Sequence, residues 1–525
     1  MRDSAPSPDR PGHDDAAAGL LDRRRCLGRL AALALAGGAV PAHAARRRPG
    51  RDSAAASLPA PVDQLPAVLR QALESSGLPL ESFGLHAQPL DGGEALLSWQ
   101  AARPFVLAST SKLLTSMAAL DLLGPAYCWR TRAYLSGPLT QGRLLGDLVI
   151  RGGGDATLTS ADLLQWFREI QAQGLREVWG DIVINREAFR LRPEDLATTP
   201  EPTPERPHHV RPDALALDAG VVRVALRSDA GGRTDIEVTP PLHDVRLVNS
   251  LGRGGGCAAS AVLRDDGSQL QPQLQVSGQW SPRCGAQQIR FAPVGVRDLG
   301  ARAIEGLWLQ AGGVLRGRVV EHDGGTPTPW RVTEAGGGAA PFAEHLSAPL
   351  SVQLREMNKR SDNLIARHLM LSLAPDFPDR SATAEAARLR MRDWLRRRGG
   401  LRDEAVVGLD TGSGLSRLER ATPQAFVHLL QRAARGPHWK LLQRTLPVAG
   451  VDGTLEGRLR GSAAQGRAWL KTGTLLDTRG LAGCVQTRGG RMIAVTLLAH
   501  HPDQNLIAAA VPALDACVDW IAHLA

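Results

Sequence analysis

Three short stretches of this chain combine hydroxyl and amine side chains at spacings that suit nucleophilic catalysis. Ser109 precedes Lys112 by three residues, Ser-Asp-Asn occupies 361–363, and Lys-Thr-Gly occupies 471–473. A serine hydroxyl attacks a carbonyl only after another group takes its proton. Residues three apart lie on one face of a helix, so the Lys112 amine is expected within hydrogen-bonding reach of the Ser109 hydroxyl. The pattern predicts acyl transfer through an ester on Ser109.

The scarcity of lysine strengthens this prediction. Only four of the 62 basic residues are lysines, namely Lys112, Lys359, Lys440 and Lys471. Arginine cannot lose its proton in a protein, whereas a desolvated lysine can and then serves as a base. Two of the four lysines occupy motif positions where arginine would fail or fit poorly. We expect Lys112 to be the base and Lys471 to be a second cation that lowers the pKa of Lys112.

The remaining motif residues suit the binding of a peptide. Ser361 could relay a proton to the leaving amine, and the amide of Asn363 has a donor and an acceptor for a peptide bond. A positive charge and hydroxyls that could hold a terminal carboxylate come from the third motif: Lys471, Thr472, Gly473 and Thr474. The backbone N–H groups of residues 109 and 474 are expected to form the oxyanion hole.

Periodicity places these motifs on helices packed against an antiparallel sheet. Apolar residues at helical spacing predict a helix from about Ser109, and others at 298–311, 364–374, 384–398 and 505–524. Three strands joined by short turns are expected to form a meander at 468–474, 480–487 and 491–499. The sequence therefore predicts an α+β domain in which helices cover an antiparallel sheet.

The length and texture of the chain indicate several domains. A chain of 525 residues exceeds one compact core, and 43% hydrophobic against 22% charged residues is a globular composition. From 129 to 291 β-branched alternation is broken by glycine and proline clusters, which predicts an inserted, mostly β region. The motif-bearing domain is then expected at 60–128 and 292–525. The basic charge is spread along the chain, so no nucleic-acid partner is expected.

The first 44 residues resemble an export signal. Three arginines at 23–25 precede an apolar run at 30–40, and Ala42-His43-Ala44 supplies small residues for cleavage after Ala44. The paired arginines suggest the twin-arginine route. The run is too short to span a bilayer, and no later segment is long enough, so the mature chain is expected outside the cytoplasm without a transmembrane segment.

Cysteine usage agrees with an oxidising compartment. Cys257 and Cys284 flank a short, Gly-rich, strand-like stretch and are the hypothesised disulfide pair. No spacing of cysteine or histidine suggests zinc, and we expect neither a metal nor a cofactor.

With its three motifs in this order, the chain resembles the D-alanyl-D-alanine carboxypeptidase/endopeptidase family, the class C low-molecular-mass penicillin-binding proteins. About 250 residues separate the first two motifs, which leaves room for inserted domains. Flanking stretches that match the family are Gly152-Gly153-Gly154-Asp155, Gly180-Asp181-Ile182-Val183, Met357-Asn358-Lys359, Gly412-Ser413-Gly414-Leu415-Ser416-Arg417 and Leu446-Pro447-Val448-Ala449-Gly450.

This resemblance implies a transpeptidase/β-lactamase-like domain with two small domains inserted. It implies periplasmic hydrolysis of D-Ala-D-Ala ends or D-amino-acid crosslinks of peptidoglycan peptides, with β-lactams as covalent inhibitors. Arg417 would recognise a substrate carboxylate. The chain departs from the family at Leu107, where proline is usual, at Thr411, where an acidic residue or asparagine is common, and across 200–209, which has no match.

Two other functions remain open from the sequence. A β-lactamase shares the three motifs, although no Glu-x-x-Leu-Asn stretch follows the second motif. A non-catalytic peptidoglycan-binding module could keep the fold without the reaction, although all three motifs are intact.

Overall fold

The computed structural model describes residues 62–525 except 229–232, 253–255, 266, 268–270, 297, 323–339 and 402–406. The expected export signal at 1–44 lies outside the described residues. Within them, no helix has the length and apolar character needed to cross a membrane.

A five-stranded antiparallel sheet forms the centre of the motif-bearing domain. Its order is β2-β1-β22-β21-β20, and every neighbouring pair runs antiparallel. The strands are β1 (Phe83–Pro89), β2 (Leu97–Trp99), β20 (Ala468–Leu475), β21 (Thr478–Gln486) and β22 (Met492–His500). The meander predicted near the C-terminus is therefore confirmed, with boundaries that differ by at most two residues. Strand β20, which carries the third motif, lies at the edge of the sheet.

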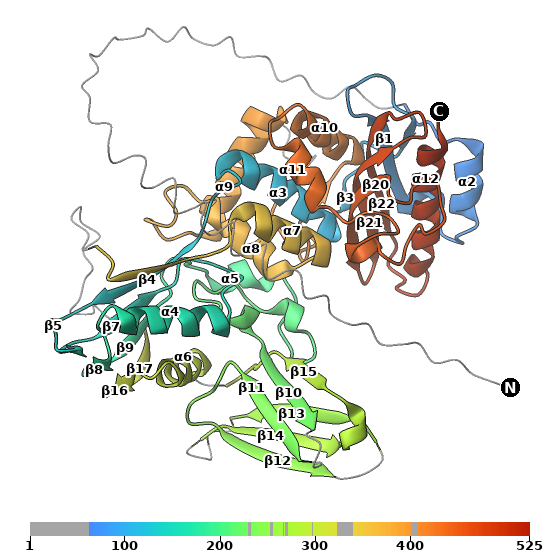
Figure 1. The fold of residues 1–525 in the computed structure, drawn as a ribbon. Helices are drawn as coiled ribbons and strands as arrows, with labels where there is room; N and C mark the ends of the chain where they lie inside the picture. Colours follow the sequence, from blue (N-terminus) through green and yellow to red (C-terminus); the bar gives the residue numbers. More distant parts are fainter. Residues whose placement is uncertain are drawn as a thin grey trace, which may run out of the picture.

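Helices cover both faces of this sheet, as Figure 1 shows. On one face α2 (Ala67–Glu74) and α12 (Ala510–His523) pack into a core with apolar side chains of the strands. The other face meets a larger helical layer: α3 (Ser111–Leu122), α7 (Leu350–Arg360), α8 (Asn363–Ser372), α9 (Ala384–Trp394), α10 (Pro423–Ala434) and α11 (Trp439–Thr445). The helices expected at 364–374, 384–398 and 505–524 are present: α9 continues directly into a π-helical turn at Leu395–Gly399, and α12 begins only at Ala510.

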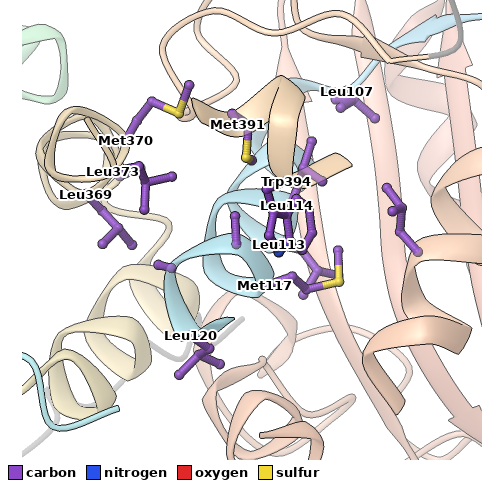
Figure 2. Close-up of a cluster of buried hydrophobic side chains, with 14 of the residues drawn as sticks. Leu107, Leu113, Leu114, Met117, Leu120, Leu369, Met370, Leu373, Met391 and Trp394 are labelled. Atoms are coloured by element: carbon purple, nitrogen blue, oxygen red, sulfur yellow. The ribbon is translucent and has the colours of Figure 1, made fainter. Parts of the chain in front are cut away.

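Helix α3 lies in the middle of this helical layer. Residues 111–120 are all buried, so the helix has no solvent-facing stripe, as expected for an element surrounded by others. Leu113, Leu114 and Met117 pack with Leu369 of α8 and Trp394 of α9 (Figure 2). The helix predicted from Ser109 begins two residues later, because a 3-10 turn at Ala108–Thr110 precedes it. The nucleophile candidate therefore lies in this turn.

The first part of the inserted region is a mixed sheet with helices rather than a mostly β structure. Its five strands follow the order β17-β9-β7-β4-β18: β4 (Arg130–Leu135), β7 (Leu148–Arg151), β9 (Ile182–Asn185), β17 (Val319–His322) and β18 (Ala343–Leu346). Short strands form a second sheet: β5 (Leu139–Thr140), β6 (Arg143–Leu144), β8 (Glu177–Val178) and β16 (Val314–Leu315). Helices α4 (Ser160–Ala172) and α6 (Leu299–Gln310) share their core, with α5 (Pro193–Ala197) nearby in the chain.

The inserted region continues beyond residue 291, where the sequence ended it. Strand β17 pairs in parallel with β9, β16 pairs in parallel with β8, and β18 pairs with β4. Helix α6, expected at 298–311, also packs here and not on the central sheet. These pairings join segments far apart in sequence, so local patterns could not reveal them. We propose that the motif-bearing domain resumes after Leu346 rather than at residue 292.

A second unit of the insertion consists of two three-stranded sheets. One has the order β11-β10-β15 and the other β12-β14-β13. The strands are β10 (Val222–Ser228), β11 (Thr234–Thr239), β12 (Arg246–Gly252), β13 (Ala259–Arg264), β14 (Gln273–Gln279) and β15 (Gln287–Phe291), and they share a separate core. The hypothesised disulfide between Cys257 and Cys284 is present here, so that prediction is confirmed. Figure 1 shows this unit at the end of the molecule away from the C-terminal helix.

Candidate active site

The first motif lies in a turn with an unusual backbone conformation. Ala108 has a φ of +46°, in the left-handed region that is uncommon for residues other than glycine. Ser109 follows it in the 3-10 turn, and Lys112 is the second residue of α3. The Lys112 amine donates to the Ser109 hydroxyl over 2.9 Å. The two side chains therefore lie within the reach that their spacing predicts.

Lys112 is completely buried and surrounded by acceptors. Its amine also donates to Oδ1 of Asn363 over 2.7 Å and to the backbone oxygen of Ser413 over 2.5 Å. Burial lowers the pKa of Lys112 from 10.5 to about 7, while the carboxylates of Glu419 and Asp362 act in the opposite direction. A large share of this amine is therefore neutral near pH 7 and able to accept a proton.

The second motif forms the junction between α7 and α8. Ser361 ends α7 with a φ of +61°, a left-handed conformation for a residue that is not glycine. Asp362 caps α8, because its carboxylate accepts from the backbone N–H of Ile365 over 2.9 Å. Asn363 is then the first residue of α8. The sharp change of direction aims Ser361 toward β20 and Asn363 toward α3, as their bonds to the two lysines show.

Lys471 repeats at Ser361 the arrangement that Lys112 has at Ser109. It is completely buried, and its amine donates to the Ser361 hydroxyl over 2.9 Å and to the backbone oxygen of Thr472 over 3.0 Å. Burial lowers the pKa of Lys471 well below 10.5, and the charge of Lys112 lowers it further. The sequence expected the opposite effect, a lowering of the pKa of Lys112 by Lys471, but burial is the main cause at both lysines.

The glycine of the third motif allows β20 to approach the nucleophile turn. A Cβ on Gly473 would lie 2.8 Å from the backbone oxygen of Leu107 and 3.2 Å from the Cβ of Ala108. Leu470 donates its backbone N–H outward from the sheet, to Pro447, over 3.0 Å. Backbone N–H groups point to alternate sides along a strand, so residues an even number apart share a side. Thr474 is four residues after Leu470, and its N–H therefore also points outward from the free edge of the sheet. The Thr474 side chain is exposed, whereas the Thr472 hydroxyl is 2.7 Å from that of Thr454.

The amide of Asn363 is engaged at both ends. Its oxygen accepts from Lys112, and its nitrogen donates to the backbone oxygen of His208 over 3.0 Å. The sequence expected this amide to fix a peptide bond, but here it orients Lys112 and binds the segment 200–209. That segment, which matched no family pattern, therefore borders the site.

Arg417 lies at the turn that follows the strand of the third motif. Its guanidinium pairs with the carboxylate of Asp477 over 3.2 Å, at the turn between β20 and β21. The side chain remains 42% exposed, so it is accessible to a ligand from solvent. Its contacts put it near the end of β20, beyond Thr474.

Sequence reasoning missed the loop that completes the environment of Lys112. Gly412-Ser413-Gly414 was recognised only as a stretch shared with a family, and Glu419 was not considered. Ser413 supplies a carbonyl to Lys112, and the buried carboxylate of Glu419 supports the loop. The only local signal is ambiguous, because a serine followed three residues later by glutamate, as at Ser416 and Glu419, also indicates a helix capping box.

The comparisons with known proteins agree with one another. The model of the D-Ala-D-Ala carboxypeptidase 3 (S13) family matches residues 65–518. D-alanyl-D-alanine carboxypeptidase DacB of Haemophilus influenzae is 26% identical over 426 residues, which cover 79% of this chain and 84% of that protein. D-alanyl-D-alanine carboxypeptidase of Actinomadura sp. is 30% identical over 418 residues, which cover 76% of this chain and 74% of that protein.

The fold is similar to that of a solved relative. The crystal structure of penicillin-binding protein 4 (dacB) from Haemophilus influenzae matches with a TM-score of 0.66 and 23% identity, covering 87% of this chain and 99% of that one. The predicted α+β class with inserted domains is confirmed by this match. Because the family model spans most of the chain and the three motifs meet in one site, the chain belongs to the D-Ala-D-Ala carboxypeptidase 3 (S13) family of peptidases.

Proposed function

We propose that this chain is a serine-type D-alanyl-D-alanine carboxypeptidase/endopeptidase that acts on peptidoglycan peptides through an ester on Ser109. The observation that carries the proposal is the pairing of two fully buried lysines with two motif serines, Lys112 with Ser109 and Lys471 with Ser361. Buried lysines lose their charge readily, and a neutral amine beside a hydroxyl can take its proton and so activate the oxygen as a nucleophile.

Acylation begins when neutral Lys112 takes the proton of the Ser109 hydroxyl. The serine oxygen attacks the carbonyl of the penultimate D-Ala, and the backbone N–H groups of Ser109 and Thr474 stabilise the oxyanion. The C–N bond breaks as the proton that Lys112 took from Ser109 is passed through the Ser361 hydroxyl, which is bonded to Lys471, to the leaving amine, so Lys112 is neutral again. Neutral Lys112 then takes a proton from the water that attacks the ester, and the Ser109 oxygen regains that proton as the acid leaves. The same acylation step on a β-lactam carbonyl opens the ring, whose nitrogen stays attached to the acyl group, and gives a covalent inhibitor adduct.

Recognition of the peptide terminus falls to the exposed end of β20. The exposed side chain of Thr474 provides a hydroxyl for the terminal carboxylate, and Arg417 offers a cation next to the same strand. Because Arg417 is paired with Asp477, a ligand carboxylate must compete with that partner. The hydroxyl of Thr472 is oriented by its bond with the Thr454 hydroxyl.

We propose that the mature enzyme acts in the periplasm after removal of residues 1–44. The basic stretch, the short apolar run and Ala42-His43-Ala44 support export, and peptidoglycan lies on that side of the membrane.

The activity is tested with two synthetic peptides that differ only in the chirality of their last two alanines. The protein, residues 45–525, should release D-Ala from the peptide that ends in D-Ala-D-Ala and leave the L-Ala-L-Ala peptide intact. Ser109→Ala should release nothing, with an unchanged circular dichroism spectrum. Binding of the D-Ala-D-Ala peptide without any release by the intact protein would contradict the proposal and favour a non-catalytic binding module. Rapid turnover of penicillin in place of peptide hydrolysis would favour a β-lactamase.

A further inference from the structure

A buried carboxylate next to the site has no part in the reaction as described so far. Glu419 precedes β19 (Arg420–Ala421) and is 1% exposed. One of its oxygens accepts from the Ser111 hydroxyl over 2.9 Å and from the Gly412 N–H over 2.7 Å. The other accepts from the Gly414 N–H over 2.7 Å and from the Thr411 hydroxyl over 3.1 Å. Four donors, two of them backbone groups, favour the ionised form of this carboxylate.

These bonds connect the nucleophile turn to the loop that faces it. Ser111 belongs to the first motif, and the backbone oxygen of Glu419 also accepts from the N–H of Leu107, before Ser109, over 2.9 Å. The loop contacts the turn closely, since a Cβ on Gly414 would lie 1.8 Å from the backbone oxygen of Ala108. From this loop the Ser413 carbonyl accepts from Lys112. Glu419 thus holds the two segments that surround the Lys112 amine, the nucleophile turn and the 411–414 loop.

The charges around Lys112 come from several elements. Asp362 at the start of α8 and Glu419 before β19 are negative, and Lys471 of β20 is the neighbouring amine. Glu419 in turn faces Asp410 and also Arg367 of α8. The Arg367 side chain is 3% exposed, and its guanidinium donates to the backbone oxygen of Val210 over 3.2 Å. Burial raises the pKa of Glu419, and Asp410 raises it further, while its hydrogen bonds oppose the rise.

We propose that Glu419 is a positioning residue for acylation, which rests on the function proposed above. Its carboxylate holds the 411–414 loop against the nucleophile turn, and its negative charge sets the pH at which Lys112 becomes an available base. Removal of this charge makes protonated Lys112 less stable, so a larger share of the amine is neutral at a given pH. The acid limb, which is the pH range over which the rate constant of acylation rises, then moves to lower pH.

The test measures the second-order rate constant of acylation by a fluorescent penicillin from pH 5 to 9, which reports ionisations of the free enzyme. Glu419→Gln is expected to move the acid limb down by about one pH unit and to lower the plateau about tenfold. The control is Thr115→Val. It removes the bond from the Thr115 hydroxyl to the Gly412 oxygen, 2.7 Å, which supports the same loop without touching the carboxylate. Its plateau should fall while its acid limb stays in place.

A matched pair keeps the test decisive if Glu419→Gln does not fold. Thr411→Asp/Glu419→Gln returns a carboxylate within reach of the same loop, because the Thr411 hydroxyl lies 3.1 Å from Glu419. Thr411→Asn/Glu419→Gln has the same shape without the charge. The acid limb of Thr411→Asp/Glu419→Gln should lie near that of the wild-type protein, and the acid limb of Thr411→Asn/Glu419→Gln about one pH unit lower. Identical acid limbs in this pair, or an unmoved limb in Glu419→Gln, would overturn the proposal. Absence of labelling in the wild-type protein would instead refute the proposed function.

Discussion

Two completely buried lysines define the chemistry of this site at the residue scale. Their scarcity in an arginine-rich sequence identified Lys112 and Lys471 as candidate catalytic groups, because only lysine can lose its proton there. The sequence could not predict the acceptors that surround Lys112, since Asn363 and Ser413 are 251 and 301 residues away. Nor could it show that burial, rather than the neighbouring amine, is the main cause of the lowered pKa.

The pKa of Lys112 predicts the pH dependence of acylation. With a pKa of about 7, the amine is mostly protonated at pH 6 and mostly neutral at pH 8. The rate constant for acylation by penicillin should therefore rise through an acid limb centred near pH 7 and level off above it. A stopped-flow or gel-based series from pH 5 to 9 measures this directly. A rate that still rises tenfold per unit between pH 8 and 9 would contradict a pKa of about 7 for Lys112.

Ser361 combines a strained backbone with a hydroxyl that the reaction needs. Ser361→Ala and Ser361→Gly both remove the oxygen that accepts from Lys471, so each should lower D-Ala release by about 10²- to 10⁴-fold. Only glycine adopts a φ of +61° without strain, so Ser361→Gly should be more stable than Ser361→Ala by about 1 kcal/mol. Urea unfolding compares the two variants. Equal stability would show that the left-handed conformation costs little here.

At the scale of elements, the site depends on how β20, α3 and the α7–α8 junction meet. Apolar periodicity predicted the helices and the C-terminal meander well, because each pattern is local. It did not predict that α3 begins at Ser111, after a turn that packs closely against Gly414 and Gly473 from other parts of the chain. The close approach of β20 to the 3-10 turn is therefore a tertiary feature.

Gly473→Ala tests this approach. The added methyl group would meet the backbone oxygen of Leu107 at 2.8 Å, so β20 must shift away from the nucleophile turn. A displacement of this size is expected to slow acylation about 100-fold. Gly457→Ala is the control, because its Cβ would have no heavy atom within 4 Å. Comparable rates for the two variants, measured with fluorescent penicillin, would argue against close packing at this edge.

At the scale of the whole molecule, the inserted region with the boundary proposed above is larger than the sequence suggested. The disulfide unit has its own core and lies away from the central sheet (Figure 1). The sequence placed the end of the insertion at residue 291, because the parallel pairing of β17 with β9 and of β16 with β8 leaves no local signature. The segment 200–209 brings the insertion to the site, where the His208 oxygen accepts from Asn363.

Loss of the disulfide should therefore affect stability and leave catalysis intact. The bond joins cysteines separated by 27 positions, and its removal in Cys257→Ala/Cys284→Ala is expected to destabilise the distal unit by about 3 kcal/mol. Calorimetry should show an earlier unfolding transition, whereas the acylation rate at 25 °C should stay within about twofold of wild type. A large loss of acylation would reveal coupling between the distal unit and the site.

The central claim is that Ser109 is the nucleophile of an acyl-enzyme. Its most direct test is labelling of the mature chain with a fluorescent penicillin, followed by peptide mass spectrometry to locate the adduct. We predict a stable adduct on Ser109 that Ser109→Ala abolishes while its melting temperature remains near that of the wild type. An adduct on another residue, or a folded wild-type protein that neither takes the label nor consumes the penicillin, would contradict the claim.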